Sequence, residues 1–369
     1  MSTTDGASPA GRPPVVPAPA WHGRPVLLCC DAANATGMGH FVRSTALAQV
    51  LSDRGADVRV LLPPDSVPSA VEQVRSAGWS VEVAESPPSG VHGRVPAPGS
   101  VVVVDSYRVD GPWLIALHRL LAESRGLLVV LDDLADRRFT ADLVVNPALG
   151  AGQLPYPSGV QVLGGPAHAL LRPEFAASRA AALQSAERLP ATPRRVLSLF
   201  GGTDVTGMAA VGAEAAVLAF PDAEVRAVVP PARRTAGLSL VPRLTVLDNV
   251  PHVHEEMLAA DLVVSAGGTT LWELCCLARP TAVVAVAENQ LPGYRALAAA
   301  GAVLPLAEGP GEDATVLADR LSRLVASPGT LSAVAGRAAT LTDGRGAERV
   351  ADEVARLVAS HTRIGESRQ

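Results

Sequence analysis

Short apolar runs alternate with amphipathic segments along most of the chain from Pro25 onward. The first unit is VLLCC (26–30), followed by a helical pattern over 42–55 and a second apolar run, DVRVLL (57–62). Several runs, such as VVVV (101–104), are apolar throughout and do not alternate with polar positions. Continuous apolar runs indicate strands buried on both faces, as in a parallel sheet covered by helices. The pattern therefore predicts a doubly wound α/β domain.

The same pattern begins again after a stretch rich in Gly and Pro at 148–166. We predict further strands at 194–202, 223–229, 243–249, 260–268, 281–287 and 302–306, and helices at 208–219, 270–277 and 291–300, with two more helices closing the chain. Two similar halves in tandem predict an N-terminal domain at 25–175 and a C-terminal domain at 190–369. Small-molecule sites commonly form in the cleft between such domains.

Composition narrows the function classes. The chain has 369 residues with a formal charge of -5, and only 3% of them are aromatic. A nucleic-acid surface, which needs cations and stacking rings, is therefore not expected. Residues 1–24 are rich in Pro, Ala, Gly and Ser and lack the apolar core of a signal peptide. We expect a disordered leader on a cytoplasmic protein that does not enter a membrane.

The four cysteines occur as two adjacent pairs, Cys29-Cys30 and Cys275-Cys276, inside apolar stretches. This spacing matches no zinc site, and neighbouring cysteines rarely bridge each other. We interpret them as buried packing residues.

The segment Gly37-Met38-Gly39-His40 joins the first predicted strand to a helix. Its glycines let backbone N–H groups at a helix start approach an anion closely. The three-glycine dinucleotide fingerprint is incomplete, so NAD binding is not expected. His40 would face the carboxyl edge of the sheet, where an imidazole can take a proton, although a capping or packing histidine is the alternative. Arg43 would add a cation near the turn, unless it is simply solvated.

Two glycine-rich turns in the second half are candidate phosphate sites. One places Gly201, Gly202 and Thr203 after a strand, and the other is Gly267-Gly268-Thr269-Thr270 at a helix start. Backbone amides and hydroxyls in such turns suit a diphosphate. Glu273, one turn into the second helix, could accept both hydroxyls of a ribose. A buried salt bridge is its alternative role, which we rank lower because its sequence neighbours at 271–276 include no cation.

The order of several motifs adds a family resemblance. The motifs are GMGHFVR (37–43), VVDSY (103–107), LDDLADR (131–137), LVVNP (143–147), ALLRPEF (169–175), LFGGTD (199–204) and the segment 265–290. Together they resemble the UDP-2,4-diacetamido-2,4,6-trideoxy-β-L-altropyranose hydrolase of pseudaminic acid biosynthesis. The segment 265–290 also resembles the UDP-N-acetylglucosamine transferase of lipid II synthesis. This resemblance implies the GT-B fold, with two Rossmann-like doubly wound domains facing a cleft.

The resemblance implies an enzyme that needs no metal or cofactor and holds UDP on its C-terminal domain. The anomeric C–O bond of a UDP-sugar would break with inversion, water would be the acceptor, and UDP would leave. His40 would be the general base, and Tyr107 would line the same site. The implied substrate side comprises Asp31, Gly37, Gly39, Arg43, Asn289 and Gln290. The implied UDP side comprises Gly201, Gly202, Thr203, Gly267, Gly268, Thr269, Thr270 and Glu273.

One departure from this resemblance concerns the acceptor. The family usually carries Arg-x-Asp at the end of the first strand, whereas this chain has Cys29-Cys30-Asp31, so that the arginine is absent. The chain is also similar to cytosylglucuronate synthase, a GT-B enzyme that transfers a sugar from a UDP-sugar to cytosine. An inverting glycosyltransferase with a small acceptor is therefore the alternative function. A sugar-nucleotide-binding protein without activity is a third class.

Asp132-Asp133 ends a predicted strand. It lacks the DxD spacing of metal-dependent transferases, and we interpret it as part of a turn.

Overall fold

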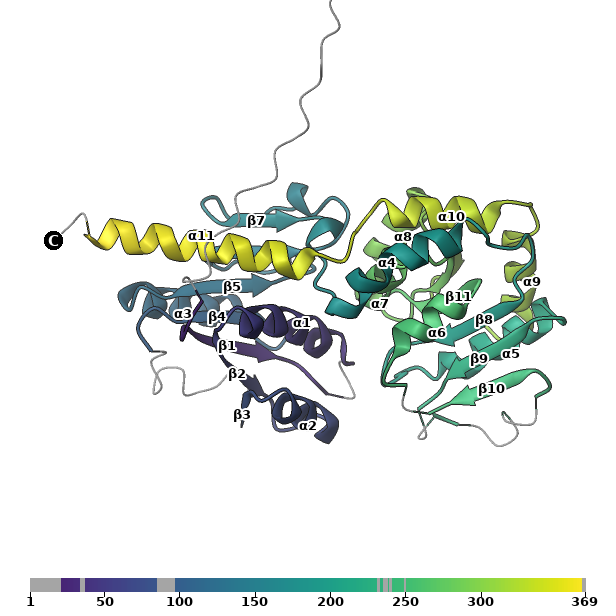
Figure 1. Cartoon of the computed structure of the whole chain (residues 1–369), viewed down its shortest axis with the longest axis horizontal. Helices are drawn as coiled ribbons and strands as arrows, with labels where there is room; N and C mark the ends of the chain where they lie inside the picture. Colours follow the sequence, from purple (N-terminus) through teal and green to yellow (C-terminus); the bar gives the residue numbers. More distant parts are fainter. Residues whose placement is uncertain are drawn as a thin grey trace, which may run out of the picture.

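The computed structural model describes residues 21–33, 37–84, 97–230, 233–234, 238, 241–248 and 250–366. Within them, two parallel sheets form two lobes that lie side by side (Figure 1). Residues 1–20 of the expected leader lie outside the described range. Trp21, the first described residue, is 2% exposed within the core of the first lobe, and Arg24 donates to the carbonyl of Gly99. The predicted disorder of 21–24 is therefore wrong, because these residues pack against the first sheet.

The first sheet has seven parallel strands in the order β3-β2-β1-β4-β5-β6-β7. Its strands are β1 (Pro25–Cys30), β2 (Asp57–Leu62), β3 (Ser80–Val83), β4 (Val101–Asp105), β5 (Leu127–Leu131), β6 (Leu143–Asn146) and β7 (Gln161–Gly164). Its helices are α1 (Gly39–Asp53), α2 (Pro68–Ser76) and α3 (Gly111–Glu123). All residues of β4 and β5 are buried, which confirms the prediction of strands covered on both faces.

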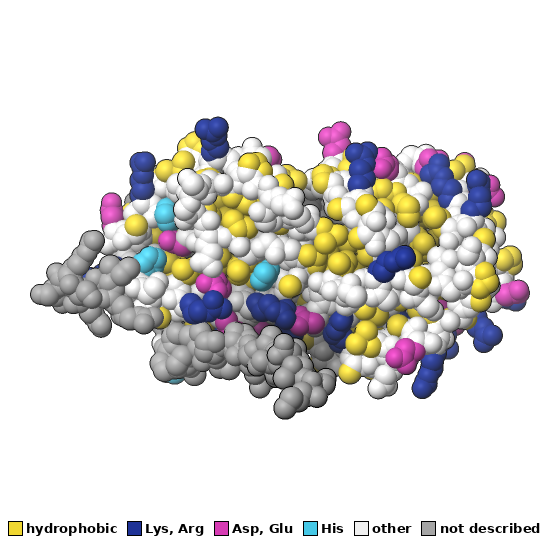
Figure 2. Space-filling view, turned by 90° about the horizontal axis from the view of Figure 1, so that it is seen from above, with side chains coloured by type: hydrophobic (Ala, Val, Ile, Leu, Met, Phe, Trp, Pro, Cys, Tyr) yellow, Lys and Arg dark blue, Asp and Glu magenta, His cyan; other side chains and the backbone are white. Residues whose placement is uncertain are grey.

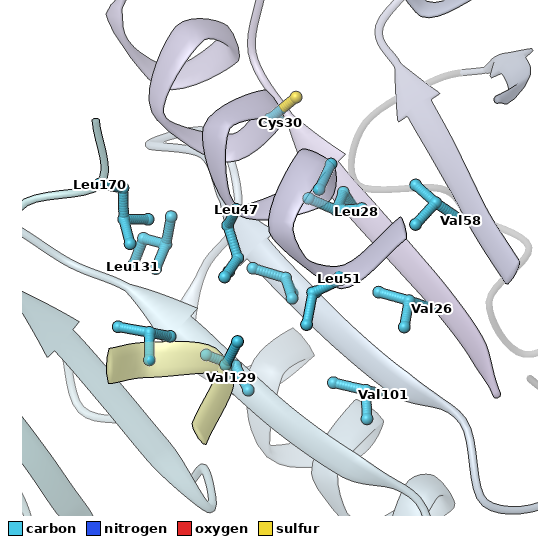
Figure 3. Packing of buried hydrophobic residues seen from close by; sticks show 14 of the residues in the cluster. Val26, Leu28, Cys30, Leu47, Leu51, Val58, Val101, Val129, Leu131 and Leu170 are labelled. Carbon is cyan, nitrogen blue, oxygen red and sulfur yellow. The ribbon is translucent and has the colours of Figure 1, made fainter. Parts of the chain in front are cut away.

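Side chains of α1 and the central strands interdigitate in the core of the first lobe. Leu47 and Leu51 of α1 pack over Leu28 of β1 and Val129 of β5 (Figure 3). This packing fixes the start of α1 at the carboxyl end of β1. Because the chain order reverses between β1 and β4, the crevice for a ligand is expected next to that helix start.

The second sheet has six parallel strands in the order β10-β9-β8-β11-β12-β13. Its strands are β8 (Arg195–Leu199), β9 (Glu224–Val228), β10 (Leu244–Leu247), β11 (Leu262–Ala266), β12 (Thr281–Val284) and β13 (Leu304–Ala307). Its helices are α5 (Met208–Ala219), α6 (Val253–Ala259), α7 (Thr270–Cys276), α8 (Leu291–Ala299), α9 (Ala314–Leu324) and α10 (Thr330–Ala339). Its order reverses between β8 and β11, the two strands followed by glycine-rich turns.

Two helices show how the chain crosses between the lobes. Helix α4 (Pro173–Ala186), which the sequence pattern did not predict, packs against α6, α7 and α10 of the second lobe. The final helix, α11 (Gly346–Glu366), runs back across the first lobe and contacts α1 (Figure 1). The range 190–369 is therefore not one unit, since its last helix belongs to the core of the first lobe. Three helices, α9, α10 and α11, follow β13, where two were expected.

Charged side chains are scattered over the face shown in Figure 2, where arginines lie among acidic groups and no continuous basic stripe is seen. Among the described residues, no helix combines the length and the apolar character that crossing a bilayer requires.

Candidate active site

His40 lies in the first turn of α1 and is 7% exposed. Its Nδ1 lies 3.2 Å from the main-chain oxygen of Asp105, at the end of β4. The carboxylates of Asp105 and Asp31 lie 3.5 Å and 3.9 Å from the same nitrogen. All three neighbours of Nδ1 are acceptors, so we assign the proton to Nδ1. This leaves Nε2 as the nitrogen that can accept a proton.

The ring of Tyr107 packs against the imidazole of His40. The two rings meet edge to face, with centroids 4.5 Å apart. The Tyr107 hydroxyl donates to Asp133 Oδ2 at 2.8 Å. Burial and the Asp133 carboxylate raise the pKa of Tyr107 above its ordinary value, so the phenol stays protonated. Tyr107 can therefore pack and donate, but it cannot act as a base near neutral pH.

Arg43 is fully engaged by two carboxylates. It donates to both oxygens of Asp105, at 2.6 and 2.7 Å, and to Asp133 Oδ1 at 2.7 Å. Burial opposes ionisation of Asp133, but Arg43 outweighs it and holds the pKa of Asp133 at about 2. Arg43 borders the pocket between the lobes, as a substrate-binding role requires, but its charge is already balanced by these two carboxylates.

Asp31 lies beneath the site and has no exposed surface. Both of its oxygens accept from Ser106 Oγ at 3.0 Å, and Arg108 Nε lies 3.7 Å away. Its predicted contact with substrate is thus corrected to an indirect role, since it can reach a ligand only through neighbours such as His40.

Asp132 is also buried, and its carboxylate accepts from Tyr156 and from the backbone N–H of Ala135. This placement agrees with the interpretation of Asp132-Asp133 as part of a turn. Among the described residues, no cluster of three or more His, Cys, Asp or Glu side chains is arranged to hold a metal ion.

The glycine loops of the two lobes face each other closely. A β-carbon at Gly39 would lie 3.0 Å from Thr269 Oγ1, and one at Gly37 would lie 4.0 Å from Thr203 Oγ1. A β-carbon at Gly202 would lie 3.7 Å from the Met38 side chain. The structure therefore brings all three predicted glycine turns to one place between the lobes.

In the loop after β8, Gly201 has a φ of +76°, a conformation that glycine adopts without strain. The next residues, Gly202 and Thr203, form the tip of this turn, and Asp204 accepts from the backbone N–H of Ala209 in α5. The turn is thus anchored to the start of α5, with Gly202 facing Met38 of the first lobe.

The turn after β11 leads from Gly267 and Gly268 to the seven-residue helix α7, which begins at Thr270. The Thr269 hydroxyl does not cap this helix. Gln290 Oε1 accepts from the backbone N–H groups of Gly267 and Val286, at 3.1 and 3.0 Å. The predicted contact of Gln290 with sugar or phosphate is thus restricted to its amide nitrogen, because its oxygen holds the loop.

Glu273 does form an ion pair. Arg172, immediately before α4, places Nη2 3.2 Å from Glu273 Oε1. Our lower ranking of the salt bridge is therefore wrong, because the cation comes from 101 residues away in the chain. Burial raises the pKa of Glu273 to about 7, with Arg172 acting in the opposite direction. The carboxylate is thus poised to change charge near neutral pH.

A pocket beside Glu273 opens between the lobes and is mostly apolar. It is lined by Val42, Arg43, Leu131, Val145, Pro147, Leu170, Leu171, Thr269, Trp272 and Glu273. The site as a whole therefore combines a histidine on one side, glycine turns and a carboxylate on the other, and an apolar recess between them.

Sequence reasoning missed Arg172 and the role of Asp105. Arg172 belongs to the motif ALLRPEF (169–175), but no residue near it in the sequence indicates that its partner is Glu273. Asp105 follows four buried valines, and a charged residue at a buried strand end is a signal that could have marked it.

Comparisons with known proteins find partial sequence relatives. No protein-family model matches the chain. One relative is the UDP-N-acetylglucosamine--N-acetylmuramyl-(pentapeptide) pyrophosphoryl-undecaprenol N-acetylglucosamine transferase of Sorangium cellulosum. The chain is 36% identical to it over 129 residues, a segment that covers 33% of this chain and 31% of the relative. It is 38% identical over 105 residues to the protein of the same name from Porphyromonas gingivalis, 27% of either chain. The chain thus spans less than a third of the length of the curated relatives it matches.

Solved structures resemble most of the chain. Acinetobacter baumannii MurG has a TM-score of 0.62 at 16% identity, covering 90% of this chain and 99% of its own. Arabidopsis thaliana UGT89C1 complexed with UDP-L-rhamnose has a TM-score of 0.61 at 14% identity, covering 91% and 98%. The spinosyn forosaminyltransferase SpnP has a TM-score of 0.55 at 17% identity, covering 91% and 99%. At these identities the likeness shows the fold, which is GT-B as predicted.

Proposed function

We propose that this protein is a glycosyltransferase that takes its sugar from a UDP-sugar and transfers it to a small acceptor, with His40 as the general base. The observation that carries the proposal is the position of His40 opposite the glycine turns and Glu273 of the second lobe. The partial relatives named as UDP-N-acetylglucosamine transferases support this class. The hydrolase suggested by the family resemblance receives no such support.

The chemistry follows from the hydrogen bonds of His40. Nδ1 donates to the Asp105 carbonyl, so Nε2 is free to take a proton from the acceptor. The acceptor atom then bonds to the anomeric carbon while the bond to the diphosphate oxygen breaks, and the electron pair leaves with UDP. Asp31 and Asp105 lie within 4 Å of the imidazole and stabilise the cation that forms. One base on one side of the sugar is typical of inversion.

The second lobe would hold the nucleotide. The turns at Gly201–Thr203 and Gly267–Thr270 supply backbone N–H groups and hydroxyls for the diphosphate. Glu273 would accept the ribose hydroxyls. This arrangement stabilises the negative charge of UDP as it leaves, so no second carboxylate acid is required.

The charges around His40 favour a neutral sugar. Among the described residues close to His40, the carboxylates of Asp31, Asp105 and Asp133 outnumber the guanidinium groups of Arg43 and Arg108. Each of these arginines already pairs with a carboxylate. A uronate would bring a further negative charge to this wall, where the residues that the structure describes offer no unpaired cation to meet it. The alternative of UDP-glucuronate as donor is therefore less favoured than UDP-glucose or UDP-N-acetylglucosamine.

The test is to incubate the protein with UDP-glucose, UDP-N-acetylglucosamine and UDP-glucuronate, with and without cytosine and a panel of small hydroxylated and amino acceptors. UDP release and glycosylated products are measured. We expect UDP release to depend on an acceptor and to be faster with the neutral sugars. Equal release without any acceptor would instead identify a hydrolase, and UDP binding without release would identify a binding protein.

Substitution of His40 separates catalysis from binding. We expect His40→Ala to lower kcat by at least about 100-fold, because a general base typically contributes that much. The Kd for UDP should change by less than about twofold, since UDP contacts lie on the other lobe. A variant with normal turnover would contradict the assignment of His40 as base.

A further inference from the structure

We propose that Arg172 is a positioning residue for nucleotide binding, which favours the ionised form of the Glu273 carboxylate and orients it toward the ribose. This inference rests on the proposed function, in which Glu273 receives the ribose hydroxyls. Arg172 belongs neither to a glycine turn nor to the wall around His40. It lies on the segment that connects β7 to α4, where the chain crosses between the lobes.

The geometry of Glu273 leaves one oxygen for a ligand. Arg172 Nη2 binds Oε1 at 3.2 Å, whereas Oε2 makes no hydrogen bond within the described part of the chain. Glu273 is 7% exposed and borders the interlobe pocket together with Thr269 and Trp272. A carboxylate so far removed from water binds hydroxyls strongly when it is ionised, but burial alone favours its protonated form. The ionised form therefore depends on a nearby cation.

Arg172 is itself held in place from two other directions. Its Nη1 lies 3.2 Å from Glu174 Oε1, and its guanidinium carbon lies 5.1 Å from the centre of the Phe175 ring. Its Nε is buried without a hydrogen-bond partner among the described residues. A stacked guanidinium between two carboxylates presents a fixed donor to Glu273, which a solvated arginine would not do.

The charged groups near Glu273 determine the direction of a pH effect. Arg172 favours its ionised form, while Glu174 disfavours it. Arg43 borders the same pocket, but its charge is neutralised by Asp105 and Asp133. Cys276, which also senses the charge of Glu273, is a buried thiol whose pKa is raised to about 11 and so carries no charge near neutrality. Arg172 is therefore the cation on which ionisation of Glu273 depends.

The test measures the Kd for UDP between about pH 6 and pH 9.5 in the full-length protein. In the wild type, binding should strengthen as the pH rises through about 7, the pKa of Glu273. Arg172→Gln removes the cation, so the pKa of Glu273 rises and the binding profile moves to higher pH. We expect binding roughly fivefold weaker at pH 7, with near-equality to the wild type at about pH 9.5. Arg172→Lys, which keeps the charge, should lie between the two.

Two further variants act as matched controls. Glu174→Gln removes the opposing carboxylate, so its profile should move to lower pH, opposite in direction to Arg172→Gln. Arg179 lies within α4 and donates to the carbonyls of Cys276 and Ala339, but it has no hydrogen bond or ion pair with Glu273 in the described part of the chain. Arg179→Gln removes those two hydrogen bonds. It should cost stability without moving the pH profile. Thermal unfolding of each variant verifies that it is folded.

The outcomes separate this inference from the function on which it rests. If the wild type does not bind UDP at any pH, the proposed function fails. If the wild type binds UDP but Arg172→Gln binds equally well at every pH, or more weakly by the same factor at every pH, the positioning role of Arg172 is overturned. Only a shift of the profile supports it.

Discussion

At the scale of single residues, the site is a set of charges whose neighbours decide what each can do. Arg43 carries a positive charge, but the carboxylates of Asp105 and Asp133 balance it. Glu273 is an anion by type, but burial raises its pKa to about 7. His40, in helix α1, owes its accepting nitrogen to the main-chain carbonyl of Asp105 at the end of β4. Residue type alone therefore does not determine chemical role here.

Asp133 gives a pH prediction at this scale. Its pKa is held at about 2, below that of an unfolded chain, so the Arg43 pair stabilises the fold above about pH 4 and less as the pH falls toward 2. We expect Asp133→Asn to lower the free energy of unfolding by about 1–2 kcal/mol at pH 6. Urea unfolding measured at several pH values should show this difference shrinking toward pH 2.

Asp65→Asn is the control for this prediction, because Asp65 pairs with Arg108 on the exposed surface. It should change stability much less at every pH. A loss in Asp133→Asn that stays constant down to pH 2 would mean that the carboxylate charge is not what stabilises this site.

At the scale of elements, strand ends and helix starts bring the chemistry together. Helix α1 begins at Gly39, directly against Thr269 of the other lobe. The reversals of strand order, between β1 and β4 and between β8 and β11, place both sets of loops at the same gap. Gln290 then ties the loop after β11 to the end of β12. The active-site gap is thus made by short loops on rigid elements.

Gly39→Ala tests how closely the lobes must approach. The backbone of Gly39 is helical, so alanine should not lower the stability of α1 by itself. Its β-carbon would, however, lie 3.0 Å from Thr269 Oγ1, and one of the two loops must shift. We expect kcat/KM for UDP-sugar turnover to fall roughly tenfold while the unfolding free energy changes by less than about 1 kcal/mol.

Gly336→Ala is the matched control, since it lies within helix α10 with no atom near the added β-carbon. It should leave turnover unchanged. In a double-mutant cycle, the effects of Gly39→Ala and Thr269→Ala on turnover should not add, because the two positions are in contact. Additive effects would show that the Gly39 contact with Thr269 does not set the gap.

At the scale of the whole molecule, the chain crosses between the lobes twice. The first crossing leads from β7 to α4 and carries Arg172, and the second leads from α10 to α11. The two crossings lie side by side, since a β-carbon at Gly346 would come 2.1 Å from the carbonyl oxygen of Ala169. The second crossing returns α11 to the first lobe, where Val350 and Val354 enter the core around Leu47. The stability of the first lobe therefore depends on the C-terminal end of the chain.

Val354→Ala tests this dependence. Val354 is 2% exposed, and removing two of its carbons should lower the free energy of unfolding by about 2 kcal/mol. Hydrogen exchange should show the loss in α1 and the first sheet, and far less in the second sheet. Arg356→Ala on the exposed side of the same helix, where it pairs with Glu353, should cost under about 1 kcal/mol. Equal losses in both sheets would contradict an assignment of α11 to the first lobe.

The local pattern of the sequence determined most of the elements. Runs such as VVVV at 101–104 and LLVVL at 127–131 are confirmed as buried parallel strands, because a strand covered on both faces must be apolar at every position. The glycine turns were also evident, since close backbone approach needs residues without a β-carbon. Helix α4 was missed because its alanine-rich sequence has no clear polar face.

What only the tertiary structure decided is which distant groups meet. Arg172 and Glu273 are 101 residues apart, and Arg43 and Asp133 are 90 residues apart. The hydrophobic periodicity of the sequence indicates whether a position is buried. Which charged side chains meet as an ion pair depends instead on the order of the strands and on where the chain crosses between the lobes. The sequence by itself therefore determined two α/β lobes with glycine turns and a histidine at their edges. The tertiary structure decided that the arginine of the first turn is neutralised and that the glutamate of the second lobe has a cation.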